Sequence, residues 1–414
     1  MLIDAAGEKG AVHSDDSMKR ILFVEDSALL RDMFLTVLSD EDGRWEVATA
    51  ASGEEALEVL KHHPFDVVAS DMHMHGMSGV ELLAEVLKLY PGTSRIIISG
   101  AADQAAAADA LGSTHQFIMK PVDVNTLRST LACLEGLDAF LKCEKLRTLA
   151  GKMKALPSFP ALYLEIMKAI EKPDTPLQTI NELIVKDPGL TAKILQIVNS
   201  AAMGLHEKVN DPMDAVQQLG LGTVKSLALS AHVFTCFTAS LRMNFPVNAL
   251  WNHLMQTGNT ARAIMRVEDA DNAYVEAAYT AGLLHDIGKL MLADSLPREF
   301  QEALTQAMDT HRPLPEVEAQ IFGATHAGLA AYLLGLWGLP APIVEAVAFH
   351  HQPEMSSNHH FSPLTAVHAA NALEHELDGQ DSDLNLEYLA KIGVADRLDA
   401  WRVEAEKVRA NGEK

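Results

Sequence analysis

The sequence has few cysteines, few basic residues and no long apolar run, and each scarcity excludes a class of protein. Its three cysteines, Cys133, Cys143 and Cys236, form no CxxC pair, which is typical of reduced thiols rather than of a disulfide framework. The formal net charge of -23 argues against nucleic-acid binding, which needs a basic face. No apolar run approaches the length of a membrane span, and the first residues lack the apolar segment of a signal peptide. We therefore expect a cytoplasmic protein, with no nucleic acid and no membrane as partner.

What is present is a chain long enough for two or three domains. With 414 residues, of which 48% are hydrophobic, it can bury substantial cores. We expect five segments along the chain. They are a disordered leader (1–18), an α/β domain (19–140), a helical linker (141–155), an all-helical domain (156–378) and a charged helical tail (379–414).

Five short apolar segments alternate with helical patterns in the first third of the chain. They read ILFVED, EVATA, FDVVASD, RIIISG and FIMK, at residues 21–26, 46–50, 65–71, 95–100 and 117–120. Strands that alternate with helices form parallel sheets covered on both faces. The pattern predicts a five-stranded, doubly wound parallel sheet, which binds ligands at the carboxyl ends of its strands. After Pro121 the strand patterns stop, and the rest of the chain reads as nearly all helix.

Polar residues stand where these predicted strands end. Glu25 and Asp26 close the first strand and Asp71 closes the third. Carboxylates that meet at one edge of a sheet form a hard-oxygen site suited to Mg²⁺, although an acidic pair alone is commonly just a solvated turn. Ser99 and Lys120 end the fourth and fifth strands. A lysine there supplies the cation that a phosphorylated aspartate needs against its oxygens.

This set of residues resembles the receiver domain of two-component response regulators, over about residues 19–140. The resemblance implies a flavodoxin-like fold and phosphorylation of Asp71 by a histidine kinase or a phosphotransfer protein. It implies roles for five further residues: Glu25 and Asp26 as Mg²⁺ ligands beside Asp71, Ser99 and Phe117 as switch residues, and Lys120 as the phosphate-binding cation. The loop after Asp71 departs from the family pattern, because His75 replaces a proline and Ser78 an acidic residue. Neither position carries the chemistry, so we expect a receiver that can be phosphorylated.

The second half carries the motif LLHDIGK at residues 283–289. Adjacent histidine and aspartate side chains at a helix can each supply a metal ligand, and the aspartate can bridge two ions. Such a doublet alone is commonly surface decoration or an internal hydrogen-bonded pair. Further histidines lie in helical stretches on both sides of it, at His253, His326, His350, His351 and His368.

The order of these motifs resembles the HDOD domain, a relative of the HD phosphohydrolases, over about residues 149–377. IVKDPGLTAKILQIVNSAAMGL, LWNHLMQTG and LAAYLLGLWGLPAPIVEAVAFHH are among the segments that carry it. The resemblance implies an all-helical bundle. Compared with catalytic HD-GYP relatives, His253, His285, Asp286, His326, His350 and His351 occupy ligand-like positions, and Lys289 is placed to meet a substrate phosphate. His368 replaces an aspartate, and less anionic charge would suit a softer ion such as iron or zinc, with manganese also considered. The GYP signature is absent, which disfavours cyclic-di-GMP hydrolysis.

Two functions of different classes follow from these resemblances. The favoured hypothesis is a response regulator that signals through a largely non-catalytic HDOD domain, by binding a downstream signalling protein or a small signal. The alternative is a metal-dependent phosphohydrolase, gated by phosphorylation, that acts on a nucleotide or another phosphate ester. The sequence leaves open whether the chain is an enzyme and whether it forms a homodimer. A DNA-binding function finds little support, because no basic recognition face accompanies the helices.

Overall fold

The computed structural model describes residues 19–39, 45–100, 113–137, 140–153, 157–158, 176–186, 188–199, 208–218, 235–236, 245–380 and 382–412. The leader predicted for residues 1–18 lies outside the described residues.

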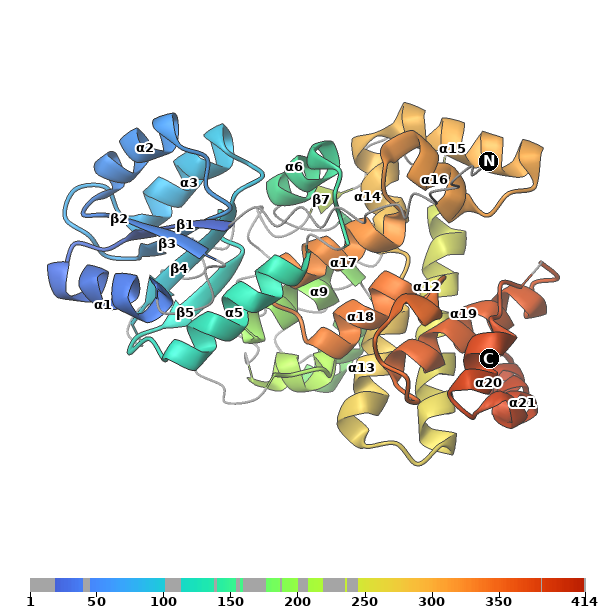
Figure 1. Cartoon of the computed structure of the whole chain (residues 1–414). Coiled ribbons are helices and arrows are strands. Elements are labelled where there is room, and N and C mark those ends of the chain that lie inside the picture. The colour runs from blue at the N-terminus through green and yellow to red at the C-terminus, as the bar shows by residue number, and fades with distance from the viewer. Residues whose placement is uncertain are drawn as a thin grey trace, which may run out of the picture.

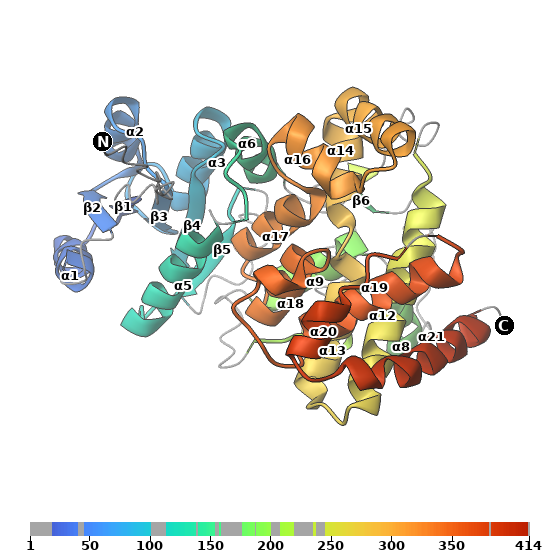
Figure 2. The same cartoon turned by 45° about the vertical axis from the view of Figure 1, so that its right-hand side comes forward.

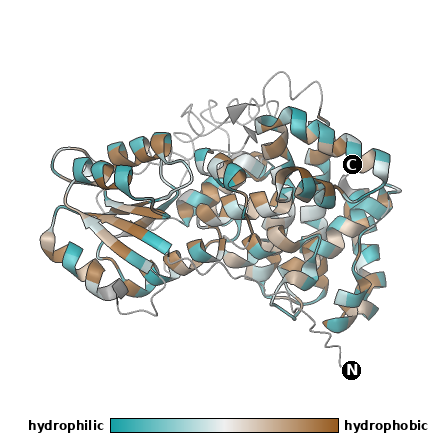
Figure 3. Cartoon of the chain, turned by 45° about the horizontal axis from the view of Figure 1, so that its top comes forward, coloured by the Kyte–Doolittle hydropathy of each residue, from teal (hydrophilic) through white to brown (hydrophobic). Residues whose placement is uncertain are grey.

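The N-terminal domain is built on a parallel sheet of five strands. The strands are β1 (Lys19–Val24), β2 (Trp45–Ala50), β3 (Val67–Asp71), β4 (Ser94–Ser99) and β5 (Gln116–Met119). Their order is β2-β1-β3-β4-β5, and every neighbouring pair is parallel. The strands are apolar and mostly buried, which is why their middle parts are coloured mainly brown in Figure 3. The predicted doubly wound sheet is confirmed.

Helices cover both faces of this sheet. Helices α2 (Gly53–His62) and α3 (Gly79–Leu89) lie on one face, and α1 (Ala28–Ser39) and α5 (Val124–Gly136) lie on the other (Figure 1). Ser78 begins α3 with a capping box: its hydroxyl accepts from the Glu81 amide while the Glu81 side chain accepts from the Ser78 amide. Ser78 therefore has a local structural use at the position where the receiver family has an acidic residue.

The rest of the described chain is almost entirely helical, as expected. Its helices are α6 (Glu144–Lys152), α8 (Leu177–Val185), α9 (Pro188–Val198), α12 (Val247–Val267), α13 (Asn272–Leu284), α14 (Ile287–Ser295), α15 (Pro297–Thr310), α16 (Leu314–Phe322), α17 (His326–Leu336), α18 (Ala341–Phe349), α19 (Pro363–Leu377), α20 (Leu386–Lys391) and α21 (Leu398–Gly412), with short 3-10 turns η4 (Pro353–Met355) and η5 (Ala395–Arg397). One correction is needed, because β6 (Pro157–Ser158) and β7 (Thr235–Cys236) form a small parallel sheet. Two residues are too few to produce a strand pattern in the sequence.

The bundle is centred on α12, α13, α18 and α19, which pack against one another (Figure 2). Helix α17 is buried along its whole length and packs against α14 and α18. The C-terminal helix α21 lies along α12 and α19, and Trp401 on it is fully buried, with its indole N–H donating to Glu268. Within the described residues, no single helix has both the length and the apolar character of a membrane span, whereas the bent pair α16 and α17 has them only when taken together.

The two domains meet along α17. Helices α5 and α6 of the N-terminal half both pack against it, and the figures place them between the sheet and the bundle (Figures 1 and 2). A hydrogen bond also links the sheet to α6: the guanidinium of Arg95, at the start of β4, donates to the Gly151 carbonyl at 2.6 Å.

Candidate functional site

The sheet brings three carboxylates together at the ends of its first and third strands. Glu25 and Asp26 follow β1, and Asp71 ends β3, the strand directly beside it. One oxygen from each carboxylate lies within 4.8 Å of the others. Glu25 and Asp71 are buried, whereas Asp26 is exposed. Such a set of oxygens, open to solvent on one side, fits Mg²⁺, which keeps several of its waters.

A cation completes this acidic site. Lys120, just after β5, places its Nζ 2.8 Å from Asp71 Oδ2 and 2.9 Å from Glu25 Oε2. Burial acts to lower the pKa of Lys120, but the hydrogen bonds to Asp71 and Glu25 outweigh it and raise that pKa. Lys120 is therefore held as a point charge beside the carboxylates.

The residues matched to the switch lie next to this site. Ser99 ends β4 and is 1% exposed, and its hydroxyl has no hydrogen-bond partner among the described residues. A buried hydroxyl without a partner is uncommon and indicates a group that can gain one. Phe117 on β5 is 5% exposed. His75, in the loop after β3, places its Nδ1 2.9 Å from Asp26 Oδ2, and this contact lowers the pKa of Asp26.

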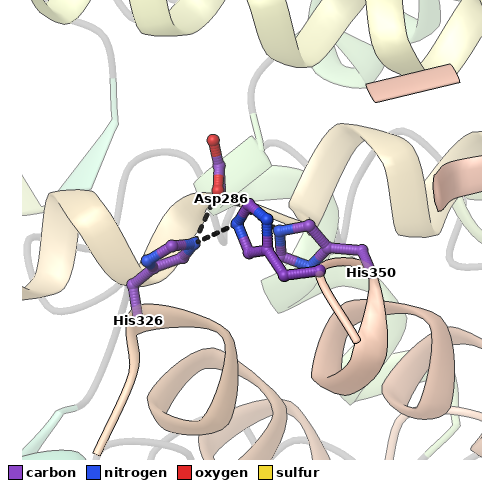
Figure 4. Close-up of side chains that lie close together, drawn as sticks. Asp286, His326 and His350 are labelled. Atoms are coloured by element: carbon purple, nitrogen blue, oxygen red, sulfur yellow. Dashed lines mark hydrogen bonds and ion pairs between the residues drawn. The ribbon is translucent and has the colours of Figure 1, made fainter. Parts of the chain in front are cut away.

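A second cluster lies inside the helical bundle and is centred on Asp286, between α13 and α14. The Asp286 carboxylate is 1% exposed. Around its Oδ1 lie the Nε2 atoms of His326, at 2.9 Å, and His350, at 3.6 Å. Around its Oδ2 lie the Nε2 atoms of His285, at 3.5 Å, and His253, at 3.9 Å. Figure 4 shows the rings of His326 and His350 turned toward the carboxylate.

The two oxygens of Asp286 therefore face two separate groups of ring nitrogens. One group combines Asp286 with His326, His350 and His351, and the other combines it with His253 and His285. His351 joins the first group through its Nε2, which lies 3.2 Å from Nε2 of His326. A carboxylate between two sets of imidazoles is the arrangement expected of a bridging ligand between two metal ions.

The rings are oriented by the hydrogen bonds of their other nitrogens. His285 and His350 cap the C-termini of α13 and α18, where each Nδ1 reaches a free helix carbonyl, that of Gly282 at 2.7 Å and that of Val347 at 2.9 Å. Nδ1 of His326 lies 2.7 Å from Glu318, and Nδ1 of His351 lies 2.8 Å from Asp383. When Nδ1 carries the proton and donates in each of these pairs, Nε2 keeps a free lone pair. A ring nitrogen with a free lone pair is the one that binds a metal.

The charge state of this cluster suits a cation. Burial lowers the pKa of His351 to about 4 and that of His253 to about 3, so both rings are neutral near pH 7. Burial acts to raise the pKa of Asp286, but the charge of Lys289 and the contacts with His285 and His326 outweigh it and hold that pKa well below its usual range.

Two buried atoms in the cluster have no hydrogen bond of good geometry within the described part of the chain, namely Oδ1 of Asp286 and Nε2 of His350. Buried polar atoms normally have a hydrogen-bond partner. These two acceptor atoms therefore indicate a site for a cation between the Asp286 carboxylate and the His350 ring. The residues present therefore fit one or two metal ions with nitrogen and oxygen ligands.

Comparisons with known proteins agree with this division of the chain. Residues 21–132 match the response regulator receiver domain, and residues 156–353 match the HDOD domain. The chemotaxis protein CheY of Thermotoga maritima is 33% identical over 105 residues, a match that spans 25% of this chain and 86% of CheY. This chain belongs to the response regulators. Its receiver domain comes first and its HDOD domain second, as the sequence analysis expected.

Other relatives extend over more of this response regulator. An uncharacterized protein of Treponema pallidum is 29% identical over 234 residues, which is 56% of this chain and 45% of that protein. The chain spans less than half the length of the first curated relatives that it matches. The crystal structure of the MmoQ response regulator from Methylococcus capsulatus is similar with a TM-score of 0.48 and 24% identity, and the match covers 60% of this chain and 98% of that one.

One residue predicted as a ligand of the HDOD domain does not belong to the cluster. Both ring nitrogens of His368 are bound to backbone: Nδ1 lies 2.7 Å from the His350 carbonyl, and Nε2 accepts from the Asn385 amide at 2.9 Å. His368 therefore has no nitrogen left for a metal, and the prediction is wrong at this position. Its ring supports the backbone at His350 instead.

Lys289, predicted to meet a substrate phosphate, hydrogen-bonds to Asp286 Oδ2. It stands one helical turn after Asp286, and its side chain is 18% exposed. Its position beside the carboxylate is compatible with that role, which stays a prediction.

Sequence reasoning missed the two carboxylates that orient the histidines. Glu318, on α16, is fully buried, and besides the His326 ring it accepts from the His326 amide at 2.8 Å. Its spacing of eight residues from His326 gave no helical signal, because a turn separates α16 from α17. Asp383 falls in the segment predicted as a charged helical tail (379–414), and nothing in that segment indicated a contact with His351.

Proposed function

We propose that this response regulator is phosphorylated on Asp71 by a histidine kinase or a phosphotransfer protein, and that the HDOD domain passes the signal to a downstream protein. The observation that carries the proposal is the placement of Asp71 between the carboxylates of Glu25 and Asp26 and the ammonium of Lys120. A carboxylate so placed can attack a phosphoryl group in line.

Each neighbour of Asp71 has a part in this reaction. Glu25, Asp26 and Asp71 would hold Mg²⁺, which offsets the negative charge on the phosphoryl oxygens. Lys120 offsets the remaining charge and changes partner, from carboxylate to phosphoryl oxygen. The hydroxyl of Ser99, which has no partner among the described residues, can then donate to the phosphoryl group. The ring of Phe117 moves into the space that Ser99 vacates. Together these movements shift the receiver domain from one of its two conformations toward the other.

The cytoplasmic location and a homodimeric state stay predictions.

The substitution Asp71→Asn tests this proposal. Incubation with acetyl phosphate and Mg²⁺ should label the wild type stoichiometrically and leave the Asp71→Asn variant unlabelled, because an amide is not a nucleophile for this transfer. The matched control is Asp32→Asn on the exposed face of α1, which should be labelled like the wild type. Stoichiometric labelling of the Asp71→Asn protein would move the acceptor elsewhere.

A second function, a metal-dependent phosphohydrolase, is supported by the cluster around Asp286. His253, His285, Asp286, His326, His350 and His351 would hold the metal, whose chemistry when bound is to polarise a phosphoryl oxygen and to lower the pKa of a bound water. Asp286 would bridge, the four rings anchored through Nδ1 would keep their Nε2 atoms in place, and Lys289 would contact a substrate phosphate. Iron, manganese and zinc all accept such a set of ligands.

Metal analysis of the purified chain, followed by assay with a generic phosphate ester, separates the two functions. Stoichiometric metal together with turnover that a chelator abolishes supports the hydrolase. Stoichiometric metal without turnover of phosphate monoesters and diesters supports a structural metal and the signalling function. A metal-free protein that still signals removes the hydrolase.

A further inference from the structure

We propose that α17 connects the phosphorylation site to the histidine cluster, so that phosphorylation of Asp71 changes the affinity of the cluster for a divalent metal. The inference rests on the proposed function, because it needs both a phosphorylated Asp71 and a metal at Asp286. It goes beyond that function by stating how the receiver domain regulates the second site.

The first step of the connection is strand β5. Lys120, which contacts Asp71 at 2.8 Å, directly follows the end of this strand, and Gln116 is at its beginning. The Gln116 side chain leaves the receiver domain and donates to the Gly335 carbonyl near the C-terminal end of α17, at 3.3 Å. A second contact comes from the His115 carbonyl, which accepts from Gln196 on α9 at 3.2 Å. Strand β5 thus leads into Lys120 at one end, and the residues at its other end, His115 and Gln116, contact the HDOD domain.

The second step is a close contact between α17 and the end of α5. A Cβ built on Gly335 would lie 2.3 Å from Cδ2 of Leu137, a distance at which the leucine would have to move. Leu137 is 2% exposed and has little space into which to move. Because packed cores are bistable rather than continuously deformable, a shift of α5 must be answered by a shift of α17.

The third step is the other end of the same helix. His326 is the first residue of α17, and its Nε2 lies 2.9 Å from Asp286 Oδ1. The backbone around it is as closely packed as at Gly335. A Cβ on Gly328 would lie 2.5 Å from the Phe140 carbonyl oxygen, and one on Gly288 would lie 2.0 Å from the His326 carbonyl oxygen. Movement of α17 would therefore be passed directly to the backbone that carries His326 and Asp286.

Between these ends α17 is a single uninterrupted helix. Its eleven residues are all buried and span about 15 Å at the usual rise of an α-helix. Arg147 of α6 stands over the Tyr332 ring in the middle of the helix, 5.9 Å from its centroid. The chain of contacts Asp71, Lys120, β5, Gln116, α17, His326 and Asp286 is thus continuous.

The coupling can be measured as two affinities. Zn²⁺ is titrated calorimetrically into the chelator-treated full chain in excess Mg²⁺, with and without beryllofluoride as the phosphoryl mimic. The Asp286→Asn chain defines any Zn²⁺ bound elsewhere. We expect the Zn²⁺ dissociation constant to change about tenfold, within the usual range of allosteric coupling. By linkage, Zn²⁺ must change the affinity for beryllofluoride by the same factor.

A pair of glycine substitutions tests the path. Gly335→Ala introduces a methyl group against Leu137, whereas Gly136→Ala introduces one on α5 with no atom within 4 Å. Gly335→Ala should reduce the tenfold effect to less than twofold, and Gly136→Ala should leave it unchanged. Gln116→Ala, which removes a side-chain contact without adding bulk, should also weaken the coupling. Circular dichroism verifies that each variant is folded.

The outcomes separate this inference from the proposed function. Equal Zn²⁺ affinities in a chain that binds beryllofluoride would contradict the coupling alone. Full coupling in both Gly335→Ala and Gln116→Ala would contradict α17 as the path. A chain that binds no Zn²⁺ at Asp286, or no beryllofluoride at Asp71, would overturn the proposed function and the coupling with it. Amide hydrogen exchange gives a second readout, because α17 should change its protection when beryllofluoride binds.

Discussion

The two candidate sites share a central aspartate paired with a lysine, yet they differ in almost everything else. Asp71 contacts Lys120 at the edge of a sheet, among oxygen ligands, with Asp26 exposed to solvent. Asp286 contacts Lys289 inside a helical bundle, among imidazoles that are largely buried. The first site is open to solvent at Asp26 and offers hard oxygen ligands, whereas the second is largely buried and offers mainly borderline nitrogen ligands.

The neighbours of each aspartate determine which metal ion its site favours. At the receiver site the neighbours are carboxylates, which favour a hard, exchangeable ion. At the HDOD site the neighbours are imidazole rings, four of them oriented through Nδ1, and such ligands favour a softer metal. The same Asp–Lys pair thus stands among oxygen ligands in one domain and among imidazoles in the other.

The largest expected effect separates the two sites by a single substitution. Asp286→Asn removes the carboxylate that both groups of histidines share, so affinity for zinc, iron or manganese should fall by more than about 100-fold. Labelling of Asp71 by acetyl phosphate should persist. Metal analysis by mass spectrometry gives the measurement, and His359→Asn in an exposed loop is the control that should retain metal. Full metal content in the Asp286→Asn chain would place the metal elsewhere.

Glu318→Gln sharpens the comparison, because the receiver site has no counterpart to this buried carboxylate among its described residues. Loss of its charge weakens the orientation and basicity of His326, and metal affinity should fall about 10- to 100-fold. The matched control is Glu316→Gln on the same helix, since Glu316 is exposed and pairs only with Arg312 among the described contacts. Equal affinities for the two variants would show that Glu318 has no part in the metal site.

Acid should weaken the HDOD domain through its largely buried His351. Burial lowers the pKa of His351 from 6.5 to about 4, so between these values the unfolded chain binds the proton and the folded chain does not. In the presence of a chelator, protonation of His351 should lower the free energy of unfolding by up to about 3 kcal/mol as the pH drops from 6.5 to 4. The His75 contact lowers the pKa of Asp26, and its stabilising effect is lost only below the ordinary pKa of 3.8.

Amide hydrogen exchange at pH 7 and pH 5 measures this effect. The protection factors of α18 and α19, which correct for the slower intrinsic exchange at acid pH, should be lower at pH 5 than at pH 7. Equal protection factors at the two pH values would contradict the prediction.

The smallest effect concerns the departure from the receiver pattern at Ser78. Ser78→Ala removes the N-cap of α3 and should cost about 1 kcal/mol of stability without loss of labelling at Asp71. Ser78→Asp restores a capping oxygen and should be nearly neutral. Urea unfolding of both variants gives the measurement. A large loss of labelling in the alanine variant would mean that Ser78 acts on the phosphorylation site.

Much of the receiver site could be predicted because its residues are tied to strand ends. Once FDVVASD is a strand, Asp71 must stand at its end, and parallel strands bring their ends to one edge. The histidine cluster was harder to predict. Its members come from α12, α17, α18 and the junction of α13 with α14, and helical periodicity says nothing about which rings converge. His368 illustrates the limit, because its sequence position suggested a ligand while its ring binds only backbone.

The sequence by itself determined the two domains, the parallel sheet and the acidic residues at its strand ends, because local periodicity and strand ends carry that information. Only the tertiary structure decided which nitrogens face Asp286, that Glu318 and Asp383 orient them, and that α17 reaches from Gln116 to His326. The physical reason is that side-chain direction and close packing between helices depend on contacts far apart in the chain, which no local pattern records.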